Sequence, residues 1–75
     1  MKEIVEVIAK ALVDRPEAVE VSEEEQERAT LVRLHVAEDD MGKVIGKQGR
    51  IAKAMRTVVK AAATRENKKV TVEIQ

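Results

Sequence analysis

Apolar and polar residues recur along this chain with periods that predict three helices and three strands. Residues 2–13 place apolar side chains at helical spacing, and this helix must end before Pro16, because proline disfavours the α conformation in the residue before it. Residues 19–22 and 29–37 alternate apolar and polar side chains, which is typical of half-buried strands. The alternation returns at residues 70–74 and predicts the last strand. The expected apolar face of the first helix consists of Ile4, Val5, Ile8, Ala11 and Leu12.

Two further helices are predicted between the second and third strands. Residues 41–45 form a short helix, which Asp39 or Asp40 is placed to cap at its N-terminus and in which Val44 and Ile45 pack inward. Residues 50–65 form a long helix, in which an apolar stripe runs beside a stripe of cations. The apolar stripe consists of Ile51, Ala54, Met55, Val58, Val59 and Ala62, and the cations are Arg50, Lys53, Arg56 and Lys60.

The order helix-strand-strand-helix-helix-strand predicts one α+β domain with a three-stranded mixed sheet. The first two strands form an antiparallel hairpin, whose turn includes the acidic run 23–25. The second and third strands are joined through two helices, which favours a parallel pair with a right-handed crossover and places all helices on one face. The opposite face is left to solvent and carries Leu31, Arg33, His35, Thr71 and Glu73.

Composition narrows the class of protein. The 75 residues include no aromatic residue and no cysteine, so aliphatic side chains supply the core and neither a disulfide nor a thiolate zinc site is available. Every apolar run is far too short for a membrane span or a signal peptide. We therefore expect a cytoplasmic protein without a membrane partner.

Charge is unevenly distributed, although the formal net charge is +0. Residues 1–28 carry a net charge of −5, whereas residues 41–69 carry +8. The nine cations of the second segment are accompanied by a single acid, Glu66. This segregation predicts one face that attracts anions and another that repels them.

Two glycines, Gly46 and Gly49, stand three residues apart with a cation and an amide between them. Glycine permits a positive φ and a close approach of the backbone to another molecule. The long helix begins directly after this two-glycine loop (residues 46–49), and a helix N-terminus presents free N–H groups and a partial positive charge. Together with Lys47 and Arg50, the loop therefore predicts a site for phosphate groups.

Other chemistries fit the sequence less well. A nucleotide-binding P-loop needs four residues between its glycines and a hydroxyl residue after its lysine, whereas Gly42 and Gly46 enclose three residues and Gln48 stands at the hydroxyl position. The single histidine, His35, has no metal-ligand partner at the usual spacing and is expected at the surface. Asp39–Asp40 fits a helix cap better than a pair for acid–base catalysis. We expect no enzyme, no cofactor and no metal site.

The two-glycine loop in this setting resembles a KH domain of the type II, prokaryotic topology, over the whole of residues 1–75. The resemblance divides the chain into an N-terminal helix–strand extension (1–28) and a strand–helix–loop–helix–strand core (29–75). A free-standing domain of this size is similar to the small bacterial KhpA-type RNA-binding proteins. That family implies single-stranded RNA as the ligand, with a Gly-x-x-Gly loop that clamps four nucleotides. It also implies a homodimer or a heterodimer with a larger KhpB-type KH protein, and roles in RNA chaperoning, post-transcriptional regulation and cell-shape control.

The loop chemistry and the resemblance together assign RNA binding to Val44, Ile45, Gly46, Lys47, Gln48, Gly49, Arg50 and Lys53. Val44 and Ile45 are expected to form an apolar floor for the bases, beside main-chain polar groups at the edge of the central strand. Many KH domains carry isoleucine three residues after the second glycine, where this chain has Ala52. Ile51 therefore fits either the groove or the core, and its helical stripe favours the core.

The absence of aromatic residues removes any stacking platform for bases, so we expect weak binding with modest sequence preference. The alternative interpretation is a KH-fold adaptor that binds a protein partner, or a ribosome-associated factor, without RNA specificity of its own. The two glycines and Lys47 favour RNA binding, because an adaptor has no need of them.

Overall fold

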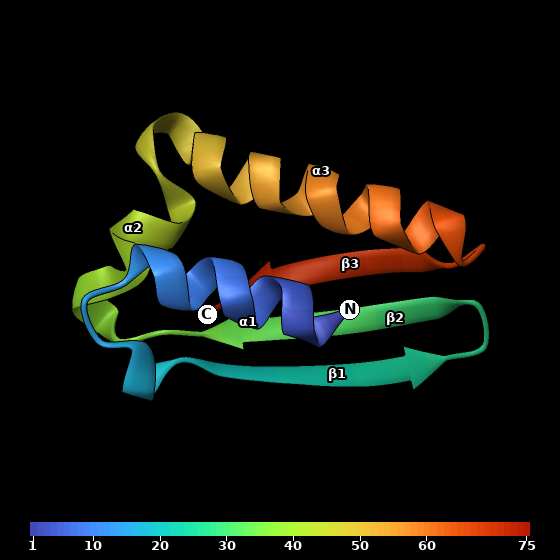
Figure 1. The fold of residues 1–75 in the computed structure, drawn as a ribbon, viewed down its shortest axis with the longest axis horizontal. Coiled ribbons are helices and arrows are strands. Elements are labelled where there is room, and N and C mark those ends of the chain that lie inside the picture. The colour runs from blue at the N-terminus through green and yellow to red at the C-terminus, as the bar shows by residue number, and fades with distance from the viewer.

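In the computed structural model, which describes all of residues 1–75, the elements follow the expected order α-β-β-α-α-β (Figure 1). They are α1 (Lys2–Leu12), β1 (Glu20–Gln26), β2 (Ala29–His35), α2 (Met41–Ile45), α3 (Arg50–Arg65) and β3 (Lys69–Ile74). Short 3₁₀ turns occupy Pro16–Ala18, Glu38–Asp40 and Lys47–Gly49. The α+β class and the order of elements are confirmed.

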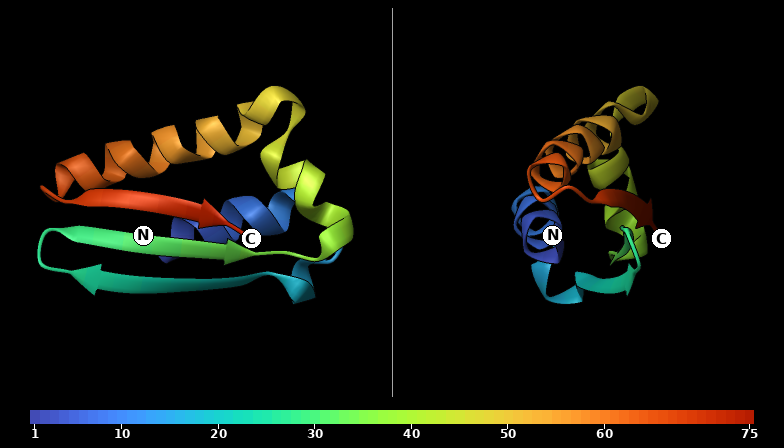
Figure 2. Two further views of the ribbon diagram at one scale, coloured as in Figure 1. Left: turned by 180° about the vertical axis from the view of Figure 1, so that it is seen from behind. Right: turned by 90° about the vertical axis from the view of Figure 1, so that its right-hand side faces the viewer.

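The sheet has β2 in the middle, antiparallel to β1 and parallel to β3, as the connections predict. All three helices cover one face, and the opposite face is open (Figure 2). Arg33 and His35 are exposed on that open face, as expected. The two-glycine loop lies at the end of the sheet where β2 and β3 finish, and the β1–β2 hairpin turn lies at the other end (Figure 1).

The first strand is longer than its pattern indicates. The sequence predicts a strand over 19–22, with residues 23–25 as its solvated end and part of a turn, whereas β1 continues through the whole acidic run to Gln26. Contacts with other segments hold residues 23–26 in the strand. The main chain keeps its ladder with β2 along the whole run, and Glu25 pairs with Lys68 at 3.4 Å.

The core lies between the helices and the covered face of the sheet. Val32 and Leu34 of β2 are fully buried, as the alternation predicts, and Val36 follows them into the interior. The core cluster consists of Val5, Ala9, Val13, Val32, Leu34, Val36, Val44, Met55, Val59 and Val72. Aliphatic packing alone therefore supplies the hydrophobic stabilisation of this domain.

Both long helices are rotated relative to their predicted stripes. In α1, Ala9 is buried, and Ala11 and Leu12 are exposed. In α3, Ala54 is exposed and Val58 is 50% exposed. The buried residues of α3 are Ala52, Met55, Val59 and Ala63. The sequence pattern does not reveal this rotation, because alanine occurs both in close helix–sheet contacts and at the surface and so does not identify the buried face.

Asp40 does not cap α2, contrary to the expectation for Asp39–Asp40. No side-chain hydrogen bond caps that helix at its N-terminus. The Asp40 side chain, 2% exposed, instead accepts the main-chain N–H of Asp14 at 3.2 Å and that of Arg15 at 3.0 Å. These two N–H groups follow the end of α1 and need acceptors once they are removed from solvent. Asp40 therefore ties the start of α2 to the end of α1.

Candidate nucleic-acid interface

The two-glycine loop has a positive φ at three of its four residues. The angle φ is +77° at Gly46, +58° at Gln48 and +73° at Gly49. Glycine adopts such angles freely, whereas a glutamine is strained there. A Cβ on Gly46 would lie 2.5 Å from Cγ1 of Ile51, so this position has no room for a side chain. Gly49 has open space around it and requires glycine for its φ alone.

Hydrogen bonds tie the two-glycine loop to the end of α2 and close it on itself just before α3. The N–H of Gly46 donates to the carbonyl of Gly42 at 2.8 Å, and the N–H of Gly49 donates to the carbonyl of Gly46 at 3.1 Å. α3 begins at the next residue, and the N–H of Arg50 donates to the carbonyl of Lys47, so the N–H groups open to a ligand are those of the following residues in the first turn. The helix dipole adds roughly half a positive charge at the same end. This arrangement is suited to a phosphate oxygen.

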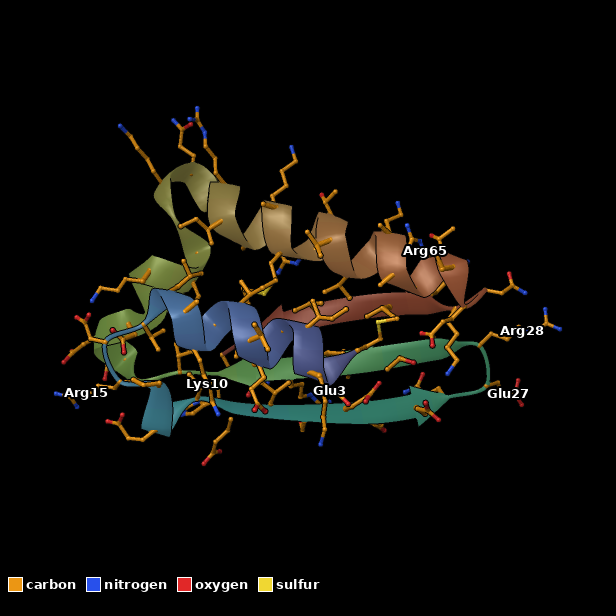
Figure 3. The ribbon with its side chains drawn as sticks, in the orientation of Figure 1. Glu3, Lys10, Arg15, Glu27, Arg28 and Arg65 are labelled. Atoms are coloured by element: carbon orange, nitrogen blue, oxygen red, sulfur yellow. The ribbon has the colours of Figure 1, made fainter.

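The polar side chains expected at the site surround this end of α3. Lys47, Gln48, Arg50 and Lys53 are all exposed. Arg50 Nη2 donates a hydrogen bond of 3.3 Å to Gln48 Oε1, which links the loop to the first turn of the helix. Nitrogen-tipped side chains project into solvent from this end of the molecule (Figure 3). None of the three cations forms an ion pair within the chain.

The apolar residues near the loop divide between surface and core. Ile45 is 37% exposed, whereas Val44 is 0% exposed and lies in the core, beneath the surface that a ligand touches. Ile51 is half-buried against Gly46 and lies outside the core cluster. The preference for Ile51 in the core was therefore wrong, because Ala52, 4% exposed, takes the inward position of that turn.

The open main-chain edge beside this site belongs to β3, not to the central strand as the sequence suggested. β2 has neighbours on both sides and no open edge. The N–H groups of Lys69 and Gln75 both donate towards β2, at 3.1 and 2.7 Å. Because main-chain groups alternate sides along a strand, the even-numbered residues of β3 direct theirs to the open edge. Arg56 of α3 reaches this edge, and its Nε donates to the carbonyl of Val72 at 3.2 Å.

Lys43 is held by acids, although it precedes the loop by three residues. Its Nζ pairs with the carboxylates of Asp14 and Asp40. The hydrogen bond with Asp14, opposed by burial, raises the pKa of Lys43 above its ordinary value of 10.5. Burial alone would raise the pKa of Asp40, but the N–H groups of Asp14 and Arg15 together with Lys43 lower it below 3.8.

This junction was missed in the sequence because it joins residues far apart in the chain. Asp14 and Asp40 are separated by 26 positions, and no periodicity connects them. The spacing of Asp40 and Lys43 was the one local signal, since residues three apart on a helical turn can pair.

Other features of the structure add no second candidate site. His35 is exposed on the open face of the sheet. The chain contains no group of three or more His, Asp or Glu side chains arranged to hold a metal ion. None of its helices has the length and apolar character needed to cross a lipid bilayer.

Comparison with known proteins identifies the family. Residues 2–74 match the family model described as KhpA/KhpB, KH domain. The chain belongs to this family. The RNA-binding protein KhpA of Clostridium perfringens is 68% identical to it, that of Clostridium acetobutylicum 64%, and that of Listeria monocytogenes 49%. Each alignment covers 99% of this chain and at least 97% of the KhpA relative. The resemblance to KhpA-type proteins over the whole chain is confirmed.

Solved structures of Era share the fold. A crystal structure of Aquifex aeolicus Era bound to GDP and AlF4⁻ gives a TM-score of 0.67 at 20% sequence identity. A structure of Era in complex with MgGDPNP and a segment of 16S ribosomal RNA gives 0.55 at 22% identity. Both matches cover 97% of this chain and 28% of the Era chain. The likeness shows that this fold also occurs as a part of a longer protein.

Proposed function

We propose that this protein binds single-stranded RNA through the two-glycine loop and the adjoining cations of α3. The observation that carries the proposal is a set of cations without acidic partners beside an anion-attracting helix end. The cations Arg50, Lys53, Arg56, Lys60 and Arg65 all lie on α3, which contains no acidic residue. Elsewhere, the ion pairs involve Lys10, Arg15, Arg33, Lys43 and Lys68. Relatives named RNA-binding protein KhpA support this assignment.

The binding mechanism follows from the parts of the site. Phosphates meet the N–H groups at the start of α3 and the charges of Lys47, Arg50 and Lys53. Bases lie against the surface of Ile45 and Ile51, and the open edge of β3 offers donors and acceptors to their edges. Unpaired bases are required, because a duplex hides those edges. Without an aromatic ring, stacking adds little and binding by one domain is weak.

The double variant Lys47→Asp with Gln48→Asp tests the loop directly. Two carboxylates repel phosphates, so RNA binding should be lost, as measured by fluorescence anisotropy with a labelled single strand. The fold should persist, because both side chains are exposed and aspartate tolerates the left-handed backbone at position 48. Circular dichroism melts provide the control. Unchanged RNA affinity in a folded variant would remove the loop from the mechanism.

We extend the proposal to the cellular setting on the strength of family membership. The protein would act in the cytoplasm as an RNA chaperone or post-transcriptional regulator, as a homodimer or with a KhpB-type partner, in a role linked to cell shape. An exposed apolar hollow between α1 and α3 supports association with a partner. It is lined by Met1, Ile4, Val58, Ala61, Ala62, Arg65 and Glu66. Two joined domains would engage one RNA with much greater avidity than a single weak site.

The second candidate function is that of an adaptor that binds a protein and not RNA. The same apolar hollow favours it, because exposed apolar patches commonly mark protein interfaces. Recovery of the protein from cells with and without RNase distinguishes the two functions. RNA binding predicts partners that are released by RNase, whereas an adaptor keeps its partners after the digestion.

A further inference from the structure

The cations of α3 continue past the two-glycine loop along one flank of the helix. Lys53, Arg56 and Lys60 follow one another at spacings of three and four residues, so they share a face. All three are exposed, and the core-facing residues Met55 and Val59 lie between them in sequence. We call Lys53, Arg56 and Lys60 the basic flank of α3.

The basic flank lies over the open edge of β3. The hydrogen bond from Arg56 Nε to the carbonyl of Val72, 3.2 Å long, fixes this placement in the middle of the strand. α3 and β3 lie one above the other over most of their length (Figure 1). Lys60 stands one helical turn beyond Arg56, farther from the loop. At 1.5 Å per residue, Lys60 lies about 16 Å along the axis from Gly49.

That distance places Lys60 beyond the cations that belong to the loop. Lys47 and Arg50 lie within or directly beside the loop, and Lys53 is one turn into the helix. Arg56 holds the edge of β3, so Lys60 is the first free cation past it. It forms no ion pair, and α3 has no acid to neutralise it.

We propose that Lys60 binds a phosphate of an RNA strand outside the four nucleotides held at the loop, so that the binding site follows the basic flank along β3. This inference rests on the proposed RNA binding and defines how far the binding site extends. Phosphate is the ligand because the flank offers a row of charges without aromatic or amide groups to read a base. An acidic protein segment on the same flank is the alternative, and it predicts that Lys60→Gln leaves the binding of both strands unchanged.

The experiment compares Lys60→Gln with Lys10→Gln, which removes the same charge from α1. Figure 3 labels Lys10 on α1, on the side of β1 and away from α3. Lys10 is exposed, and its bond to Glu6 lies within one helix, so its loss leaves the fold intact. Each protein is titrated with a four-nucleotide strand and with a strand of about ten nucleotides, by NMR at several salt concentrations. A longer strand offers the protein more binding positions, which raises its apparent affinity. Each variant is therefore compared with wild type at the same strand length, where this factor is equal.

We expect Lys60→Gln to weaken binding of the longer strand several-fold and to reduce its log–log salt slope by about 0.7, which corresponds to one phosphate contact. Binding of the four-nucleotide strand should be unchanged, and Lys10→Gln should match wild type with both strands. Equal effects of Lys60→Gln on both strands, or equal effects of the two variants, would overturn the extended site. Wild-type protein that binds neither strand would instead overturn the proposed RNA binding itself.

Discussion

At the residue scale, Gly42 and Gly46 differ in the space that surrounds them. Gly46 has a φ of +77° and no room for a Cβ, because Ile51 packs against it. Gly42 lies inside α2, and a Cβ there would meet nothing within 4 Å. The same substitution at the two positions therefore separates the need for glycine in the loop from the general effect of alanine.

We predict that Gly46→Ala destabilises the fold by about 1–3 kcal/mol, the cost of a strained backbone and a displaced Ile51. Gly42→Ala should instead stabilise it by up to about 1 kcal/mol, because alanine favours a helix. Urea denaturation of both variants measures the change in the free energy of unfolding, which should have opposite signs in the two. Equal effects would show that the Gly46 backbone is not held as described.

Asp40 is the residue whose protonation should control stability in acid. Its pKa is lowered in the folded state, so its ionised form stabilises the fold at every pH above the unfolded value of about 3.8. That contribution is lost as the pH falls below this value and through the folded pKa. Lys43 and Asp14 share the junction, and Lys43 stays charged throughout this range.

We predict that wild-type protein loses more stability between pH 5 and about pH 2 than Asp40→Asn does, since the amide does not titrate. Asp40→Asn should also be less stable than wild type at neutral pH, because an amide oxygen replaces only one of the two acceptors of Asp40. Urea melts over this pH range measure both effects. Parallel pH profiles for the two proteins would show that Asp40 does not contribute to the acid sensitivity.

At the scale of elements, α3 presents two different flanks. The basic flank faces the open edge of β3, and an apolar flank with Val58, Ala61 and Ala62 borders α1. Val58 is 50% exposed, whereas Met55 and Val59 of the same helix are buried. Under the proposed function, RNA would meet the basic flank and a partner would meet the apolar flank.

We predict that the protein dimerises through the apolar flank at micromolar to millimolar concentration, and that Val58→Glu makes it monomeric. Val7→Glu is the matched control, because Val7 is also an exposed valine, 69% accessible, and does not line the hollow between α1 and α3. Sedimentation equilibrium, repeated with a KhpB-type partner, measures the association. A wild-type protein that remains monomeric under both conditions contradicts the prediction.

At the scale of the whole molecule, local patterns predicted the fold, and non-local contacts account for what they missed. The strand order was predictable from the connections between the strands. The strands and the loop were predictable because alternation at Val32 and Leu34 and the two glycines are signals within a few residues. The burial of Asp40 and its hydrogen bonds were not predictable, because its partners follow α1, 25 and 26 positions earlier in the chain. The rotation of α3 depends on how closely its alanines approach the sheet, which periodicity does not report.

The candidate site was predicted in part for the same reason. Lys47, Gln48, Arg50 and Lys53 are exposed where the loop chemistry expects them. Val44 is buried, as its inward position in α2 predicts, and it therefore lies beneath the groove floor that it was also expected to line. The free edge of β3 follows from the predicted strand order, but its contact with Arg56 joins residues 16 positions apart and has no local signal.

The segregation of charge between the two parts of the chain predicts how RNA binding responds to salt. Residues 41–69 carry a net charge of +8 and residues 1–28 one of −5, so only the loop and α3 should meet phosphates. If two to five of the cations Lys47, Arg50, Lys53, Arg56 and Lys60 do so, the log–log slope of affinity against salt is about −1.4 to −3.5, at roughly −0.7 per contact.

The most direct test of the central claim is a titration of wild-type protein with one RNA sequence as a single strand and as a duplex, at several salt concentrations. We expect weak binding of the single strand with a slope in that range, and weaker binding of the duplex, whose bases are paired. A slope near zero, or equal affinity for strand and duplex, would contradict it.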